Sequence, residues 1–134
     1  MTFCMQSPCF LLEMHILKNQ PFLSRLRFAL TGLMAGFRLE HSLRFQAAAL
    51  ATMIIVLIAA RPEPLWWALV ALTSSAVIAA ELFNTALECL ADHLHPEHHA
   101  QIRIAKDCAA AAVLVAALGA LAVATSLIIH LLHR

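Results

Sequence analysis

Residues 79–92 read Ala-Ala-Glu-Leu-Phe-Asn-Thr-Ala-Leu-Glu-Cys-Leu-Ala-Asp, and they continue a long apolar segment that starts near Leu65. Two glutamates, an asparagine and an aspartate stand where lipid-facing residues would be expected. An ionised carboxylate at the centre of a bilayer costs at least about 2.5–3.5 kcal/mol. A membrane-spanning helix that keeps such groups is therefore predicted to need them for chemistry.

The polar residues of this stretch fall on one side of a helix. At about 100° per residue they occupy a stripe roughly 100° wide. Counted from Leu65 at about 1.5 Å per residue, Glu81 lies about 24 Å along a hydrocarbon core about 30 Å thick, and Glu88 about 10 Å further on. The inner acid is expected to reach a lipid hydroxyl, and the outer acid a metal ion or a phosphate. The stripe consists of Glu81, Asn84, Thr85, Glu88 and Asp92.

The composition of the whole chain favours a membrane protein of one domain. Of its 134 residues, 62% are hydrophobic and 13% charged, which is too apolar for an ordinary soluble domain. A soluble Ala/Leu-rich bundle is the alternative, but the apolar segments reach spanning length. We expect an all-α integral membrane fold, with an amino-terminal amphipathic surface helix and three transmembrane helices. No nucleic-acid partner is expected.

The segments of this fold can be placed along the chain. A basic helix with one apolar face is expected to lie in the membrane interface, and two prolines in Arg61-Pro62-Glu63-Pro64 separate the first two spans. The expected ranges are 21–38 for the surface helix and about 41–60, 65–91 and 97–130 for the spans. Residues 21–134 would form the domain. For residues 1–20, a disordered extension and a translation start at Met14 both stay open.

The distribution of Lys and Arg predicts an orientation. Seven such residues lie on the amino-terminal side or in the second loop, and two lie on the opposite side. Because cytoplasmic loops carry the excess of positive charge, the amino terminus and the second loop are expected in the cytoplasm. The seven are Lys18, Arg25, Arg27, Arg38, Arg44, Arg103 and Lys106, and the two are Arg61 and Arg134.

A second group of polar residues is expected opposite the acidic stripe. If residues 97–110 continue the third span outward, His99, Arg103, Lys106 and Asp107 share one face. Lys is a compact charge suited to phosphate oxygens, and Glu40 stands near the start of the first span. Such a set could supply ligands for a divalent metal and a general base.

Simpler interpretations exist for several of these residues. Glu88 or Asp92 alone could extend to water, and Lys106 with Asp107 could be an ion pair flanking the membrane. The loop histidines lack a companion Cys or an HExxH frame, so no zinc site is expected. These histidines are His93, His95, His98 and His99.

The motif in residues 81–92, followed by Ala105-Lys106-Asp107 leading into Ala-Ala-Val, resembles the prokaryotic diacylglycerol kinase family. The family pattern is E-x-x-N-[ST]-A-x-E-x-x-x-D, then A-K-D-x-x-[AS]-A-A-V. Glu40 and Arg44 look like its E-x-x-x-R element, and the resemblance covers about residues 21–133. It implies a homotrimer in the bacterial inner (cytoplasmic) membrane that converts diacylglycerol and MgATP to phosphatidate and ADP.

The resemblance also implies roles for single residues. Glu81 would be the general base, Glu40 and Glu88 would bind Mg²⁺ together with ATP, and Asn84 would orient this cluster, with Asp92 and Arg44 in support. The remaining residues implied at the nucleotide are Glu97, His98, His99, Lys106 and Asp107.

The chain departs from the family pattern in the surface helix, where Pro21 and Phe28 stand in the places of an Arg and a Tyr. Arg25 or Arg27 is a candidate substitute for that Arg. Some family members phosphorylate undecaprenol, so an undecaprenol kinase stays open as the alternative. A proton or ion transporter subunit and a small non-catalytic membrane subunit are the alternatives outside the kinases.

Overall fold

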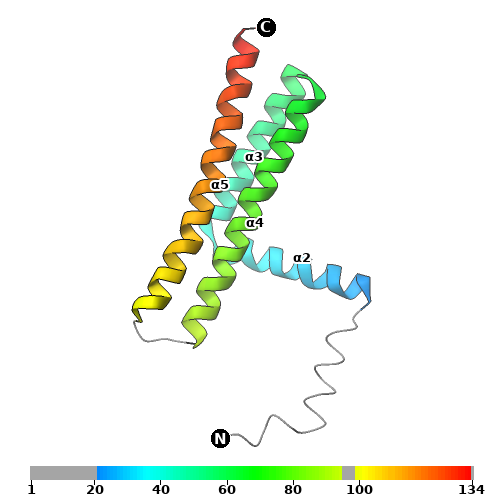
Figure 1. Ribbon diagram of the computed structural model, residues 1–134. Helices are drawn as coiled ribbons and strands as arrows, with labels where there is room; N and C mark the ends of the chain where they lie inside the picture. Colours follow the sequence, from blue (N-terminus) through cyan, green and yellow to red (C-terminus); the bar gives the residue numbers. More distant parts are fainter. Residues whose placement is uncertain (1–20, 95–98, 134) are drawn as a thin grey trace, which may run out of the picture. The chain divides into compact units, whose positions relative to one another are not determined.

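The structure is a computed structural model that describes residues 21–94 and 99–133. It contains helices α2 (Phe22–Leu39), α3 (His41–Ala60), α4 (Pro64–Leu94) and α5 (Ala100–Leu132), and no strand among the described residues (Figure 1). The predicted all-α fold is confirmed. Three of the helices, α3, α4 and α5, are long and apolar enough to cross a membrane.

Two of these helices are longer than a bilayer core requires. α4 has 31 residues and α5 has 33, so each extends well past the roughly 20 residues that a span needs. The carboxyl-terminal part of α4 and the amino-terminal part of α5 carry the polar residues. The extra length therefore takes those residues beyond the apolar middle of each helix.

The chain divides into two compact units, one up to Ala35 and one from Gly36 onward. The described part of the first unit is most of α2, whose apolar side chains, including Phe22, Leu26 and Leu30, are exposed. The second unit holds the end of α2 and all of α3, α4 and α5.

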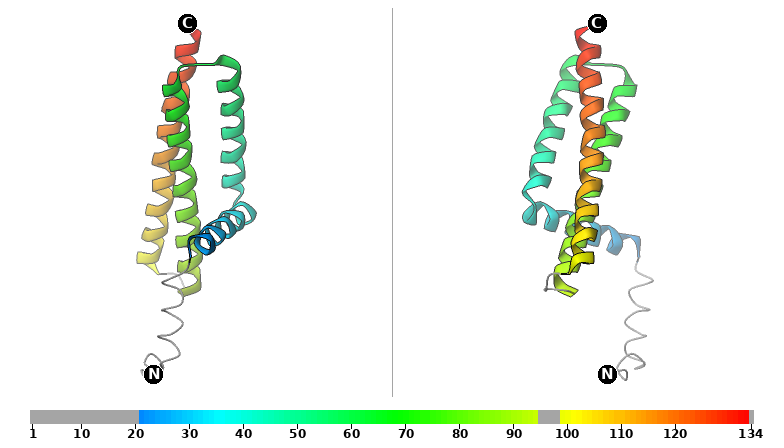
Figure 2. Two further views of the ribbon diagram at one scale, coloured as in Figure 1. Left: turned by 90° about the vertical axis from the view of Figure 1, so that its right-hand side faces the viewer. Right: turned by 60° about the vertical axis from the view of Figure 1, so that its left-hand side comes forward.

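In the second unit, α4 and α5 run antiparallel and pack along each other far more extensively than α3 packs on α4 (Figure 2). A cluster of buried apolar residues, Leu57, Val70 and Leu127, joins the three helices. Near it, the rings of Trp66 and His130 lie with centroids 5.3 Å apart. Many other apolar side chains of these helices are exposed, which is expected of a bundle that meets lipid or other subunits.

The connection between α3 and α4 is short and sharply turned. Arg61 has a left-handed backbone (φ 47°), and its N–H bonds to the carbonyl of Leu57, which ends α3. Pro64 is the first residue of α4, a position at which its missing N–H removes no helical hydrogen bond. The two prolines thus separate the helices as expected.

The junction between α2 and α3 brings the start of α3 close to α4. Glu40 is extended (φ −109°, ψ 122°), so the helix is interrupted there and begins again at His41. A Cβ added at Gly36 would lie 2.7 Å from Leu82 Cδ2 and 3.4 Å from Leu43 Cδ2. The absence of a side chain at Gly36 therefore allows the end of α2 to contact Leu82 on α4.

Candidate functional site

Glu81 is buried on α4, with 6% of its surface exposed. Its Oε1 accepts a hydrogen bond from Ser42 Oγ on α3, and its backbone carbonyl accepts one from Thr85 Oγ1 at 3.0 Å. A buried carboxylate needs such partners because desolvation without them is costly. The contact with Ser42 links the acid proposed as the base to the first turn of α3.

One turn further along α4, Asn84 Nδ2 donates to Glu88 Oε1 at 3.1 Å. Both residues are partly buried, and Asn84 Oδ1 is a buried acceptor without a hydrogen-bond partner. Since buried polar groups are usually paired, this oxygen is suited to a ligand or an ion.

The polar stripe becomes more exposed toward the end of α4. Asp92 is exposed and accepts a charged hydrogen bond from Lys106 Nζ on α5. Next to Lys106, Asp107 forms a more open pair with Arg103, with 3.9 Å between Arg103 Nε and Asp107 Oδ2. Lys106 thus faces the α4 acids, whereas Asp107 pairs along its own helix.

Glu40 and Arg44 lie at the α2–α3 junction. Glu40 takes the N-cap position of α3, but its side chain makes no capping bond. Arg44 Nε and Nη2 donate to the carbonyls of Phe37 and Arg38, each at 2.9 Å. Because the last carbonyls of a helix lack intrahelical partners, Arg44 completes the end of α2 and holds it to α3.

His99 comes directly before α5 in an extended conformation and caps it, since its Nδ1 accepts from Gln101 N at 3.3 Å. The described helix α5 begins at Ala100. Glu97 and His98, also predicted at the nucleotide, lie outside the described residues.

The carboxylates suit a metal that is held together with substrate. Within residues 21–94 and 99–133, no three His, Cys, Asp or Glu side chains gather as a ready metal cage. Mg²⁺ in kinase sites usually takes one or two carboxylates, and waters and phosphates supply its other ligands. Glu88 beside the unpaired Asn84 Oδ1 fits that kind of donor set.

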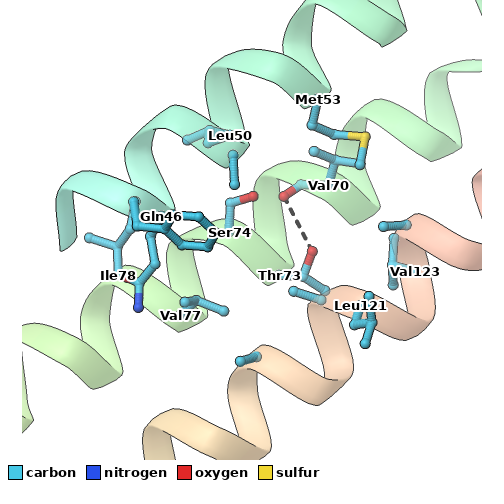
Figure 3. A pocket seen from close by; sticks show the side chains of 15 residues that line it. Gln46, Leu50, Met53, Val70, Thr73, Ser74, Val77, Ile78, Leu121 and Val123 are labelled. Carbon is cyan, nitrogen blue, oxygen red and sulfur yellow. Dashed lines mark hydrogen bonds between the residues drawn. The ribbon is translucent and has the colours of Figure 1, made fainter. Parts of the chain in front are cut away.

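A cavity of about 310 Å³ lies between α3, α4 and α5 (Figure 3). Its walls are mostly apolar, with Gln46, Thr73 and Ser74 as the polar exceptions, and Gln46 Oε1 is buried without a hydrogen-bond partner. Gln46 stands one helical turn after Ser42, and Val77 one turn before Glu81. One end of the cavity is therefore next to the Ser42–Glu81 contact.

The sequence predictions did not include Ser42 or this cavity. The available signals were a hydroxyl two residues after Glu40 and an amide, Gln46, inside an apolar span. Neither residue type reveals what it faces on α4, because the facing residues depend on how α3 and α4 are aligned in space.

The comparisons with known proteins agree with the motif. The family model for prokaryotic diacylglycerol kinase matches residues 27–128. A diacylglycerol kinase of Synechocystis sp. is 36% identical over 104 residues, 77% of this chain and 59% of that protein. The chain thus spans about three-fifths of that relative's length.

An undecaprenol kinase of Bacillus subtilis is 32% identical over 84 residues, which is 63% of this chain and 68% of that protein. The residues that the family model matches include the whole polar stripe on α4, together with Glu40, Lys106 and Asp107. The resemblance is confirmed, and the chain belongs to the prokaryotic diacylglycerol kinase family.

Proposed function

We propose that this protein is an ATP-dependent lipid kinase that phosphorylates diacylglycerol to phosphatidate. The observation that carries the proposal is the position of Glu81, a buried carboxylate between an apolar cavity and a series of increasingly exposed polar groups. A lipid alcohol approaches from the cavity side and ATP from the exposed side. Family membership favours this function over a transporter or a non-catalytic subunit.

Glu81 acts as the general base in this proposal. Phosphoryl transfer depends on positioning, on charge stabilisation and on a group that accepts the proton of the attacking hydroxyl. The lipid hydroxyl gives its proton to the Glu81 carboxylate while its oxygen bonds to the γ-phosphorus, and ADP leaves with the electrons of the broken bond. Burial of Glu81 keeps competing water away from this step.

The exposed end of the site is assigned to the nucleotide. Glu40 and Glu88 would hold Mg²⁺, and Asn84 orients Glu88 through its hydrogen bond. When bound, Mg²⁺ neutralises charge on the phosphates. Lys106 and Asp107 contact ATP, and His99, Glu97 and His98 are assigned to the same region. Asp92 supports Lys106 as its ion-pair partner.

The preferred lipid is diacylglycerol, because the relative with that name has the higher identity over the longer aligned region. Undecaprenol is the second candidate, since a relative with that name shares 32% identity. Both lipids offer a primary hydroxyl on a long apolar body, so the same base serves either.

The assembly is proposed as a homotrimer in the bacterial inner membrane, with the amino terminus in the cytoplasm. The exposed apolar side chains on α3, α4 and α5 supply surfaces for subunits and lipid. The excess of Lys and Arg near α2 and in the first turns of α5 supports the orientation.

Purified protein in detergent micelles tests the function. ATP consumption should depend on added diacylglycerol and Mg²⁺, and labelled phosphate should appear in phosphatidate. A parallel reaction with undecaprenol compares the two lipids. ATP consumption that is independent of either lipid, or the absence of a phosphorylated lipid, would contradict the proposal.

A further inference from the structure

Ser42 differs from most other hydroxyl residues of the helices in the group to which it donates its hydrogen bond. Those others donate to a carbonyl four residues earlier in their own helix, at distances of 2.7 to 3.0 Å. Ser42 instead crosses from α3 to α4 and donates to Glu81 Oε1. The residues with the local bond are Thr31, Thr52, Thr73, Ser75, Thr85, Thr125 and Ser126.

The local backbone explains this choice. The residue four positions before Ser42 is Arg38, which lies in α2, on the other side of the extended Glu40. The Arg38 carbonyl already accepts a hydrogen bond from Arg44. The Ser42 hydroxyl is therefore available for a partner on another helix, and the close contact of Gly36 with Leu82 brings α4 within its reach.

We propose that Ser42 is a positioning residue for the kinase reaction, which holds Glu81 by Oε1 so that the second carboxylate oxygen receives the lipid proton. This inference rests on the proposed function. A hydrogen bond to an ionised acceptor is stronger than one between neutral groups, so it restricts the rotation of the carboxylate. General-base catalysis requires this restriction, because the base must lie within hydrogen-bond reach of the proton that it takes.

In the proposed step, the phosphoryl group moves from ATP to the lipid hydroxyl as Glu81 takes the hydroxyl proton. The lipid O–H bond breaks, and its proton goes to the second oxygen of Glu81. The lipid oxygen forms a bond to the γ-phosphorus of ATP, and the bond from that phosphorus to the β–γ bridging oxygen breaks, with its electron pair leaving on ADP. Ser42 keeps its proton throughout and contributes only the orientation of Glu81.

Substitution at Ser42 should change turnover and not substrate binding. Ser42→Ala should lower kcat about 10-fold to 100-fold, the range expected for a lost hydrogen bond to a charged group, while KM for diacylglycerol and for ATP changes less than about twofold. Ser42→Thr restores the hydroxyl and should recover most of the activity. Ser75→Ala, which removes a hydroxyl bonded within α4, is the matched control and should leave kcat unchanged.

Two results would overturn the inference. One is an unchanged kcat in Ser42→Ala, and the other is a Ser42→Thr enzyme as slow as Ser42→Ala. In a Glu81→Gln background, Ser42→Ala should cause no further loss, because the group that it positions is already gone. A further independent loss in that background would count against the inference.

Infrared spectroscopy separates this inference from the kinase assignment. The difference spectrum between the wild type and Glu81→Gln identifies the Glu81 carboxyl band without any substrate. Ser42→Ala should shift that band, and Ser75→Ala should not. A shifted band in a protein without lipid kinase activity would contradict only the proposed function, whereas an unshifted band would contradict the role of Ser42.

Discussion

Asn84 and Glu88 lie one turn apart on α4, and the side-chain amide of Asn84 donates to Glu88 Oε1 at 3.1 Å. This bond occupies one oxygen of Glu88 and leaves the other for a further ligand. The Asn84 oxygen is meanwhile buried without a partner. Glu88 is thus held in place by a neighbour on its own helix, as a carboxylate that binds a metal usually is.

Glu88→Gln is expected to raise the Mg²⁺ concentration needed for half-maximal activity steeply. Asn84→Ala should raise it about 10-fold to 100-fold, as is typical when the partner of a metal ligand is removed. The measurement is a Mg²⁺ titration of lipid-dependent ATP consumption at saturating ATP. Glu63→Gln, at the α3–α4 connection, is the control, and an unchanged Mg²⁺ dependence in Glu88→Gln would argue against a ligand there.

Lys106→Gln is expected to raise the KM for ATP at least about 10-fold, because it would remove the proposed charged hydrogen bond to a phosphate. Asp92→Asn should raise the KM for ATP less. The Asp92 side chain is 68% exposed, and an exposed ion pair contributes little energy, so its loss should displace Lys106 only slightly. Initial rates at varied ATP concentrations give the KM for each of the two variants. Equal effects of both substitutions would indicate that Lys106 acts only through its pair with Asp92.

Gly36→Val is expected to destabilise the fold by about 1–3 kcal/mol, the usual cost of overpacking. Its Cβ would lie 2.7 Å from Leu82 Cδ2, so Leu82→Ala should recover part of the loss. Thermal unfolding in micelles, followed by circular dichroism, provides the measurement. Gly32→Val is the control because nothing lies within 4 Å of a Cβ there, and equal losses at both glycines would refute the contact.

Arg44→Lys is expected to loosen the α2–α3 junction, because Lys cannot make both bonds to the Phe37 and Arg38 carbonyls. The loss of about 1 kcal/mol for one hydrogen bond corresponds to roughly fivefold faster amide exchange around Glu40. Hydrogen–deuterium exchange with mass spectrometry measures this. Arg27→Lys, in the first half of α2, should leave exchange at the junction unchanged; if it accelerates exchange equally, the two bonds are not what holds the junction.

The sequence predicted the helices and the polar stripe because both follow from local patterns. Glu81 and Asp92 share a face through helical periodicity alone, and the prolines after Arg61 separate two spans wherever the helices lie. α4 nevertheless continues three residues past the expected end at residue 91, to Leu94. Residues 92–94 contain no proline or glycine, so the helix can continue beyond the expected end of the span.

The contacts between helices could not be predicted in the same way. Ser42 meets Glu81, and Lys106 meets Asp92, only because of the relative alignment of α3, α4 and α5. That alignment depends on close packing at points such as Gly36 and on the turn at Arg61. A single sequence shows which residues occupy a face but not which residue stands opposite.

The base role of Glu81 is tested most directly by one comparison of turnover. Glu81→Gln keeps the size and the hydrogen-bonding capacity of the side chain but cannot accept the lipid proton. Purified Glu81→Gln should lose at least about 100-fold in diacylglycerol phosphorylation, the lower end of what a general base contributes, while it still binds ATP and keeps the oligomeric state of the wild type. Wild-type turnover in this variant would contradict the account.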